Sequence, residues 1–284
     1  METIIGIGTA GCKVASLFEN YNNIYDVYKI DSDNLEESPR NFLVEKKKTH
    51  EEYSMDNTNF SYFFKDIDTE VLVILSGGGQ TSGVVPKVLE RLVERMGAEK
   101  VNVLFIMPDV EELHGDDKLS NRLTYNVLMQ WARSNMFNML YLADNLKLEE
   151  IVNDTPVYNY YEKINQLLVS TIHMTNVFKH TDAVVASSFR NSDCSKIATF
   201  GIFDVENNDE KPFFSLDNIL EKHYYYGINK QALETDGNLM SGIKNKMKEI
   251  NSSGQRGSYG VYETSYEQNY GYSIFFSQKI QKDT

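Results

Sequence analysis

The sequence predicts an α/β fold with three parts: a Rossmann-like, mainly parallel sheet with helices on both faces, a long central helix, and a smaller α+β domain. Short apolar runs alternate with amphipathic helical patterns through residues 1–155, and two of these runs end in glycine-rich turns. One long helical pattern follows within residues 156–180, and mixed patterns fill residues 181–284. Alternating strands and helices favour a parallel sheet, because each parallel connection needs a crossover element.

The first apolar run, Thr3–Ile7, is expected to be a strand, and Cys12–Phe18 is expected to be a helix. Between them Gly6–Gly11 matches the pattern GxGxxG. A second strand is expected at Val27–Ile30, and Asp31 follows it about 20 residues after the last glycine. A carboxylate at this spacing binds ribose in NAD-type Rossmann enzymes, so a dinucleotide oxidoreductase is one candidate function.

Residues 35–64 read mostly as loop with a short strand near residues 42–44, and a fully apolar strand is expected at Val71–Leu75. This strand leads into a glycine-rich turn and then into an amphipathic helix with Pro86 in its first turn and Gly97 at its end. The amides of such a turn can face an anion at a helix N-terminus. The sequence therefore predicts a phosphate cradle formed by Gly77, Gly78, Gly79, Gln80, Thr81, Ser82 and Gly83.

Further strands are expected at Val101–Met107 and Phe137–Leu142, with a helix over residues 119–135 between them. Ligands of parallel sheets bind outside the carboxyl ends of the strands. The residues expected at those ends are Gly8, Asp31, Gly78, Asp109 and Asn145.

The central helix is expected from Pro156 to about Phe178, with Tyr161 and Asn165 on one side near its start. Beyond it, a strand is expected at residues 197–203 and helices at residues 216–226 and 238–250. An aromatic hairpin is expected over residues 259–280, turning near residues 268–269.

Composition and charge disfavour several classes of function. The formal net charge of −13 disfavours a nucleic-acid surface, and the basic run at residues 46–48 is too short to provide one. Cys12 and Cys194 make neither a disulfide framework nor a metal pair, and no histidine pattern indicates a metal site. No signal peptide and no apolar run of membrane-spanning length is apparent. We therefore expect a cytoplasmic protein with no membrane and no direct nucleic-acid partner.

These motifs together resemble the tubulin/FtsZ superfamily of GTPases over residues 1–180. Gly8, Thr9, Ala10, Gly11 and Cys12 resemble its first phosphate loop, and Gly77–Gly83 resembles its GGGTGSG signature. Asn145–Leu148 resembles its Asn-x-x-Leu loop, and Tyr161–Asn165 resembles the start of its central helix. The resemblance implies bound GTP or GDP with Mg²⁺, phosphates held by backbone amides, and guanine selected by Asn145, Tyr161 and Asn165.

Two departures from the family pattern bear on activity. In the signature, Gln80 replaces a threonine and Thr81 replaces a glycine, which would alter the loop if that glycine needs a positive φ. The family also supplies an Asn-x-Asp-x-x-Asp loop to the next subunit's nucleotide. The stretch Asn191–Lys196 resembles that loop, with Asp193 at the first acidic position and Lys196 at the second. Asp193 is the candidate catalytic acid, and the alternative for it is a plain solvated loop residue. Asp182, nearer the end of the helix, is a second candidate for the acid.

The resemblance implies a protein that assembles head to tail into filaments and hydrolyses GTP between subunits. Its short C-terminal part resembles the minimal tubulins encoded by viruses of bacteria, which implies a bacterial or phage-infected cytoplasm. Two alternatives stay open: the NAD-type oxidoreductase, and a tubulin-like scaffold that binds nucleotide without hydrolysing it.

Overall fold

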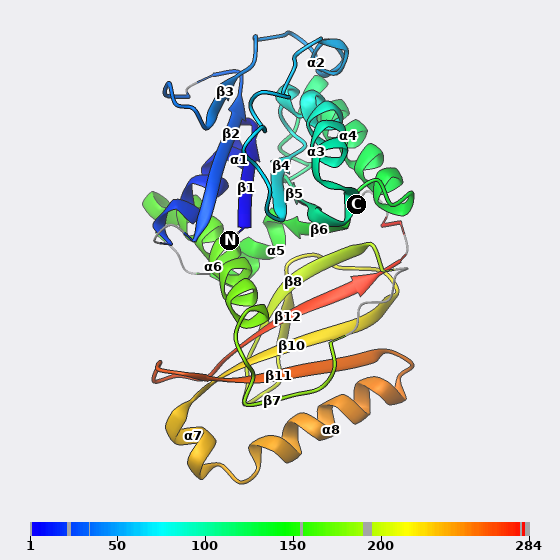
Figure 1. Ribbon diagram of the computed structural model, residues 1–284. Helices are drawn as coiled ribbons and strands as arrows, with labels where there is room; N and C mark the ends of the chain where they lie inside the picture. Colours follow the sequence, from blue (N-terminus) through cyan, green and yellow to red (C-terminus); the bar gives the residue numbers. More distant parts are fainter. Residues whose placement is uncertain are drawn as a thin grey trace. The chain divides into compact units, whose positions relative to one another are not determined.

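The computed structural model describes residues 2–21, 24–33, 35–153, 156–189, 195–278 and 280–281. The chain divides into two compact units, Met1–Val169 with Ile280–Thr284, and Ser170–Lys279. The division falls inside the longest helix, α6 (Tyr160–Lys179), which corresponds to the predicted central helix. Figure 1 labels the elements of both units.

The first unit is built on six parallel strands in the order β3-β2-β1-β4-β5-β6. The strand order reverses between β1 and β4, because β2 and β3 lie on one side of β1 and β4 to β6 follow on the other. Doubly wound folds bind ligands at this position. The strands are β1 (Glu2–Ile7), β2 (Tyr25–Asp31), β3 (Asn41–Leu43), β4 (Val71–Ser76), β5 (Val101–Met107) and β6 (Met139–Asp144).

Helices cover both faces of this sheet, since every residue of β5 and the first five of β4 are buried. The α-helices of the unit before α6 are α1 (Gly8–Leu17), α2 (His50–Met55), α3 (Val85–Met96), α4 (Asp116–Arg133) and α5 (Asn145–Val152). Short 3₁₀ segments complete it: η1 (Phe18–Asn20), η2 (Gln80–Val84), η3 (Ala98–Lys100) and η4 (Val157–Asn159).

Several elements of the first unit differ from the sequence-based prediction. The first helix begins at Gly8 rather than Cys12, so the GxGxxG turn is largely helical. Helix α2 lies in a stretch predicted as loop, and α5 begins at Asn145, also predicted as loop. Both are short and end without a glycine or proline stop, so their helical pattern is weak.

The second unit contains a mixed sheet in the order β8-β12-β10-β11-β7, with β9 on β8. Among the residues of this unit that the structure describes, β10 and β11 pair in parallel and the other pairs are antiparallel. Its strands are β7 (Val185–Ala186), β8 (Ile197–Phe203), β9 (Glu210–Pro212), β10 (Ile219–Asn229), β11 (Arg256–Thr264) and β12 (Tyr270–Ser277), and its further helices are α7 (Lys230–Thr235) and α8 (Leu239–Ser252). Helix α8 packs Ile243, Met247 and Ile250 against Tyr224 and Tyr226 of β10.

Two predictions for this unit are wrong. The helix predicted over residues 216–226 is instead strand β10, whose tyrosine-rich end is buried throughout Tyr224–Ile228. Aromatic side chains favour strands, and this burial satisfies them better than a one-sided helix would. The hairpin predicted over residues 259–280 is also wrong, because β10 lies between β11 and β12 and pairs with both.

In the part of the chain that the structure describes, no helix combines the length and apolarity that a bilayer crossing requires.

Candidate functional site

The turn after β1 presents unpaired amides at the start of α1. Helix α1 begins at Gly8, and Ile7 before it makes no side-chain cap. The N–H groups of the first helical turn have no intrahelical acceptor, so those of Gly8, Thr9 and Ala10 are available to an anion. Gly8 has a φ of 70°, a conformation that favours glycine, and Thr9 and Ala10 are exposed.

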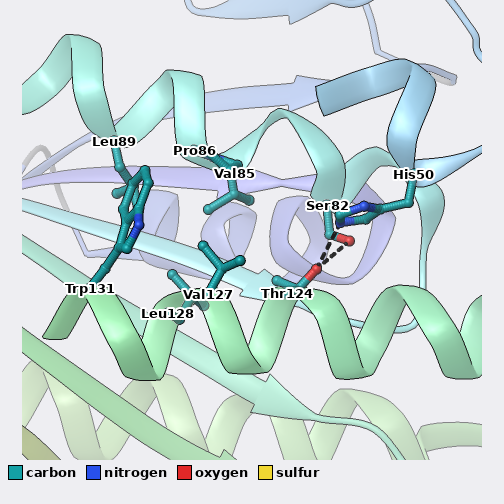
Figure 2. Close-up of a pocket in the computed structure, with 9 residues that line it drawn as sticks. All are labelled: His50, Ser82, Val85, Pro86, Leu89, Thr124, Val127, Leu128 and Trp131. Atoms are coloured by element: carbon teal, nitrogen blue, oxygen red, sulfur yellow. Dashed lines mark hydrogen bonds between the residues drawn. The ribbon is translucent and has the colours of Figure 1, made fainter. Parts of the chain in front are cut away.

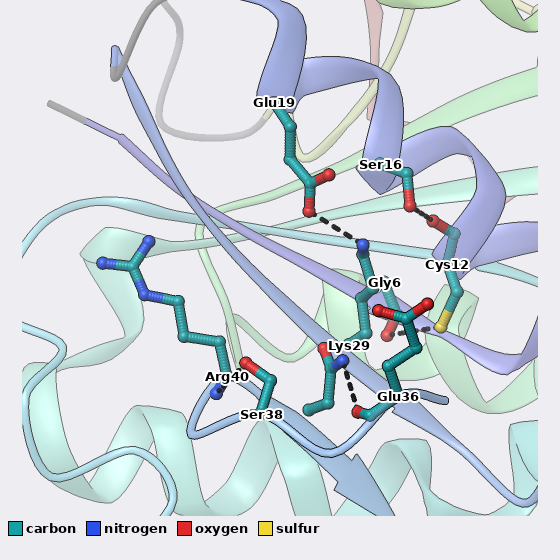
Figure 3. Close-up of polar contacts among 9 residues, drawn as sticks. Gly6, Cys12, Ser16, Glu19, Lys29, Glu36, Ser38 and Arg40 are labelled. Atoms are coloured by element: carbon teal, nitrogen blue, oxygen red, sulfur yellow. Dashed lines mark hydrogen bonds and ion pairs between the residues drawn. The ribbon is translucent and has the colours of Figure 1, made fainter. Parts of the chain in front are cut away.

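Gly6 and Gly11, the other glycines of this motif, allow the backbone of helix α1 to pack closely against the sheet. A Cβ on Gly11 would lie 2.3 Å from the Ile74 carbonyl oxygen, and a Cβ on Gly6 would lie 2.6 Å from the Gly11 carbonyl oxygen. Helix α1 can therefore lie directly against β1 and β4. The Cys12 thiol is buried and donates to the Gly6 carbonyl oxygen at 3.4 Å, as Figure 3 shows. Burial, followed by the Asp31 carboxylate, raises the pKa of Cys12 to about 12, so its thiol is inert at neutral pH.

Asp31 closes β2 beside this turn and is only 4% exposed. Its carboxylate accepts hydrogen bonds from the Thr9 hydroxyl at 3.1 Å and the Ser32 amide at 2.8 Å. Burial raises the pKa of Asp31, and these two donors only partly offset that effect. Asp31 therefore fixes the end of β2 against the first turn of α1.

The turn after β4 also presents free amides. Gly79 precedes η2, is exposed, and provides no side-chain cap; a Cβ built on it meets nothing within 4 Å. The amides of Gly79, Gln80 and Thr81 have no acceptor among the described residues. Gly78 is closer to its surroundings, since its Cβ would lie 3.1 Å from Leu113. Gly79 is thus the most open point of the turn.

Gly77 and Gly83, at the two ends of this turn, allow neighbouring helices to pack closely against it. A Cβ on Gly77 would lie 2.3 Å from Asn121 Oδ1 of α4, and one on Gly83 would lie 2.3 Å from the His50 carbonyl oxygen of α2. Neither Gln80 nor Thr81 has a positive φ. The two substitutions in the signature are therefore compatible with an ordinary 3₁₀ backbone.

The two turns lie next to each other at the point where strand order reverses. The hydroxyl oxygens of Ser32 and Thr81 are 3.3 Å apart, and a Cβ on Gly8 would lie 3.9 Å from Thr81 Cβ. The ends of β1, β2 and β4 thus bring the turns at these two helical N-termini next to each other. Such an arrangement suits a ligand with several phosphates.

Neither the comparison with protein-family models nor that with curated proteins gave a match. Solved structures gave matches over nearly the whole chain. FtsZ from M. jannaschii matches with a TM-score of 0.69 at 16% identity, covering 97% of this chain and 88% of that one. TubZ from Bacillus thuringiensis, in a GTPγS-form protofilament, matches with a TM-score of 0.70 at 18% identity, covering 97% and 86%. GDP-bound CetZ1 from Haloferax volcanii matches with a TM-score of 0.72 at 17% identity, covering 98% and 94%.

The chain has the tubulin/FtsZ fold. This likeness confirms the predicted class, a mainly parallel sheet with helices followed by a smaller second domain. At these low identities the structural similarity shows the fold but not the activity.

Within the tubulin/FtsZ fold, the remaining predicted ligand residues lie on α5 and α6. Asn145 is the first residue of α5, directly after β6, and Asp144 caps that helix by accepting from the Leu146 amide at 2.9 Å. Tyr161 is 66% exposed in the first turn of α6, and Asn165 is half-buried one turn later. The Tyr160 hydroxyl bonds the Glu149 carboxylate, which brings α5 and the start of α6 together.

The predicted catalytic residue Asp193 lies outside the described residues, as does Cys194. Asp182, the alternative acid, is exposed in the loop after α6. Across the described ranges, no group of three or more His, Cys, Asp or Glu side chains could hold a metal ion.

Sequence reasoning missed the polar residues that support the second turn, including His50 of α2 and Thr124 of α4. They border a small apolar cavity of about 20 Å³ between α2, α3 and α4 (Figure 2). One signal could have revealed α2: Thr49 caps it by accepting from the Glu52 amide, and Glu52 accepts in turn from the Lys48 amide. A threonine three residues before a glutamate is the pattern of a capping box.

Proposed function

We propose that this chain binds a guanine nucleotide, with its phosphates between the turns after β1 and β4. One observation supports this most strongly: the turns that carry the amides of Gly8–Ala10 and Gly79–Thr81, all without acceptors within their helices, lie next to each other. Six orphan donors at two helix N-termini suit the negative charge of a triphosphate. The exposed, unobstructed Gly79 leaves room for it.

The ligand's base is assigned to the residues of α5 and α6. Tyr161 presents an exposed ring that can stack on a purine, and the side-chain amides of Asn145 and Asn165 can donate to and accept from the guanine edge. Mg²⁺ would offset phosphate charge. The fold likeness to GDP-bound CetZ1 and to GTPγS-form TubZ supports guanine as the base.

Self-association and hydrolysis form the second part of the proposal. TubZ structures of this fold are protofilaments and helical filaments, so we infer that this chain also forms a head-to-tail homopolymer. A heterologous contact that does not close produces such a filament. Asp193 is proposed to orient the attacking water at the neighbouring subunit's nucleotide.

The test is the GTPase rate per subunit measured against protein concentration, with sedimentation at each concentration. Assembly-coupled hydrolysis predicts a rate that rises steeply above the concentration at which protein begins to pellet. A flat rate down to dilute protein would reject that coupling. Asp193→Asn should retain polymer and bound GTP but lose phosphate release, whereas the matched variant Asp182→Asn should behave like the unmodified protein. Bound GTP without phosphate release from the unmodified chain would indicate the scaffold alternative.

The NAD-type alternative rests on Asp31, whose position at the end of β2 matches that of a ribose-binding carboxylate. In this structure the carboxylate already accepts from Thr9 and Ser32. Thermal unfolding with GTP, GDP or NAD separates the two functions, because a ligand raises the melting temperature only of a protein that binds it. Protection by NAD and not by GTP would support the oxidoreductase.

A further inference from the structure

The side chain of Gln80 connects the second glycine turn to two helices. Its Oε1 accepts from the His50 amide at 2.8 Å and lies 2.9 Å from the Ser120 hydroxyl, whose single proton is shared with the Asp116 carbonyl oxygen at 2.8 Å. Its Nε2 donates to Asp117 Oδ1 at 2.9 Å. The carboxamide thus bridges the start of α2 and the first turns of α4.

A second connection runs through the hydroxyls beneath the turn. His50 Nε2 lies 3.1 Å from Thr124 Oγ1, which donates to Ser82 Oγ at 3.0 Å, and Ser82 Oγ donates to the Gly79 carbonyl oxygen at 2.7 Å. Since Thr124 gives its only proton to Ser82, His50 Nε2 must be the donor in the first bond. Figure 2 shows His50, Thr124 and Ser82 meeting at the edge of the small cavity.

This chain of bonds fixes one peptide group. In a trans peptide the carbonyl of one residue and the N–H of the next point in opposite directions. The Ser82 hydroxyl and the Ser82 amide, at 2.7 and 3.2 Å, both hold the Gly79 carbonyl oxygen. The N–H of Gln80 on the same peptide is therefore turned away from Ser82, and it has no acceptor among the described residues.

We propose that Gln80 and His50 are positioning residues that hold the Gly79–Gln80 peptide with its N–H toward the ligand's phosphates. The proposal rests on the proposed nucleotide binding. In it the Gln80 side chain does not touch the nucleotide; it holds the backbone that does. Helices α2 and α4 hold the turn in place through these two side chains. Gly83 and Gly77 allow the two helices to approach the turn closely enough for these contacts.

The proposal explains how the turn tolerates glutamine where the related signature has threonine. Preorganised donors bind more tightly than mobile ones, because their ordering is completed before the ligand arrives. Coupling of this kind is reciprocal, so phosphate binding should also stabilise α2 on the turn. Six residues are too few to form a stable isolated helix, so α2 depends on such contacts.

The experiment compares Gln80→Leu with the matched control Gln130→Leu, an exposed glutamine of α4. Binding of GTP, GDP and guanosine is titrated with dilute protein, below the concentration of assembly. Gln80→Leu should weaken GTP binding about tenfold, equivalent to roughly one net hydrogen bond. It should weaken GDP less and guanosine hardly at all. Gln130→Leu should match the unmodified protein for all three.

A second variant keeps the test decisive if Gln80→Leu does not fold. Thr124→Val removes the hydroxyl between His50 and Ser82 while keeping the side-chain shape, and it should also weaken GTP more than guanosine. Its control is Thr175→Val, at a buried threonine whose hydroxyl donates to the Thr171 carbonyl oxygen of its own helix. Equal GTP affinity in variant and unmodified protein, or equal losses for GTP and guanosine, would overturn the positioning role. Absence of GTP binding by the unmodified protein would instead reject the proposed function, and the positioning role with it.

Discussion

The Thr9 hydroxyl donates a hydrogen bond to the Asp31 carboxylate at 3.1 Å, joining the first glycine turn to the end of β2. Asp31 is buried there, and the nearby Lys46 cation only partly offsets the effect of burial on its pKa. The pair therefore holds the turn in place and keeps a largely desolvated carboxyl group beside the proposed phosphate position.

Asp31 should make folding stability depend on pH. Because burial raises its pKa above the unfolded value of 3.8, the folded state binds the proton more tightly. Stability should then fall as pH rises from about 4 through the folded pKa. In nucleotide-free protein, the melting temperature of Asp31→Asn minus that of the unmodified chain should increase between about pH 4 and about pH 7. Asp68→Asn, at an exposed carboxylate, is the control. A difference that stays constant or shrinks over this range would contradict the assignment.

Gly79 and Gly77 should respond differently to alanine. Gly79 has a φ of −103° and a ψ of 148°, which any residue adopts, and its Cβ position is open. Gly79→Ala should therefore leave the free energy of unfolding unchanged or raise it by about 0.5 kcal/mol at most, while weakening GTP binding. Gly77→Ala should destabilise the fold by about 1–3 kcal/mol, because its Cβ would clash with Asn121. Denaturant unfolding and GTP titration of both variants check this. Equal stabilities would refute the assignment of Gly77 to packing.

Tyr161 should contribute to nucleotide affinity by stacking. Loss of an aromatic platform under a base typically weakens binding by about 1–3 kcal/mol, so Tyr161→Ala should bind GTP at least fivefold more weakly. Tyr62→Ala, at a tyrosine 78% exposed elsewhere in the first unit, should bind normally. Both variants should fold normally, because each side chain is largely exposed. Unchanged affinity in Tyr161→Ala would remove the ring from the base site.

A buried ionic cluster should stabilise the second unit. Glu210 lies 3.0 Å from Lys222 Nζ and 3.1 Å from Lys246 Nζ, and it accepts from the Tyr224 hydroxyl at 2.5 Å. Glu210→Gln should lower the free energy of unfolding by about 2 kcal/mol, since it leaves the two ammonium groups partly buried without a carboxylate. Exposed Glu206→Gln is the control. Urea unfolding of both variants measures the effect, and equal midpoints would contradict it.

The same cluster has a predicted pH response. Burial alone would raise the pKa of Glu210, but the Tyr224 hydroxyl and both lysines outweigh it and lower the pKa below 4.5. The stability that Glu210 contributes should therefore be complete above that value and be lost as pH falls through the folded pKa. The difference between the unmodified protein and Glu210→Gln should shrink correspondingly in acid.

The local sequence pattern was sufficient to predict strands whose residues are nearly all buried. Strands β5 and β8 have the predicted bounds, because mainly apolar runs occur there, with Asn102 and Thr199 as their polar residues. Strand β10 was predicted as a helix, since its first residues, Ile219–His223, lack the polar–apolar alternation of a strand, and its pairing with β11 and β12 decides the conformation. The predicted hairpin failed for the same long-range reason.

The candidate site shows a similar limit. The two glycine turns could be located from the sequence, because glycine runs after apolar strands have a direct physical meaning. Some of these glycines allow close packing and others face outward. The packing partners are Ile74, Asn121 and His50, which are distant in sequence from the glycines that they contact. The bonds of Gln80 likewise join residues 30 to 40 positions apart.

The most direct test of the account is an equilibrium titration of the purified, nucleotide-free chain with GTP, ATP and NAD. We predict one GTP bound per chain, with ATP and NAD at least tenfold weaker, and a GTP affinity that falls in Gly79→Ala while folding is retained. A chain that binds no GTP, or that binds NAD in preference to it, would contradict the account.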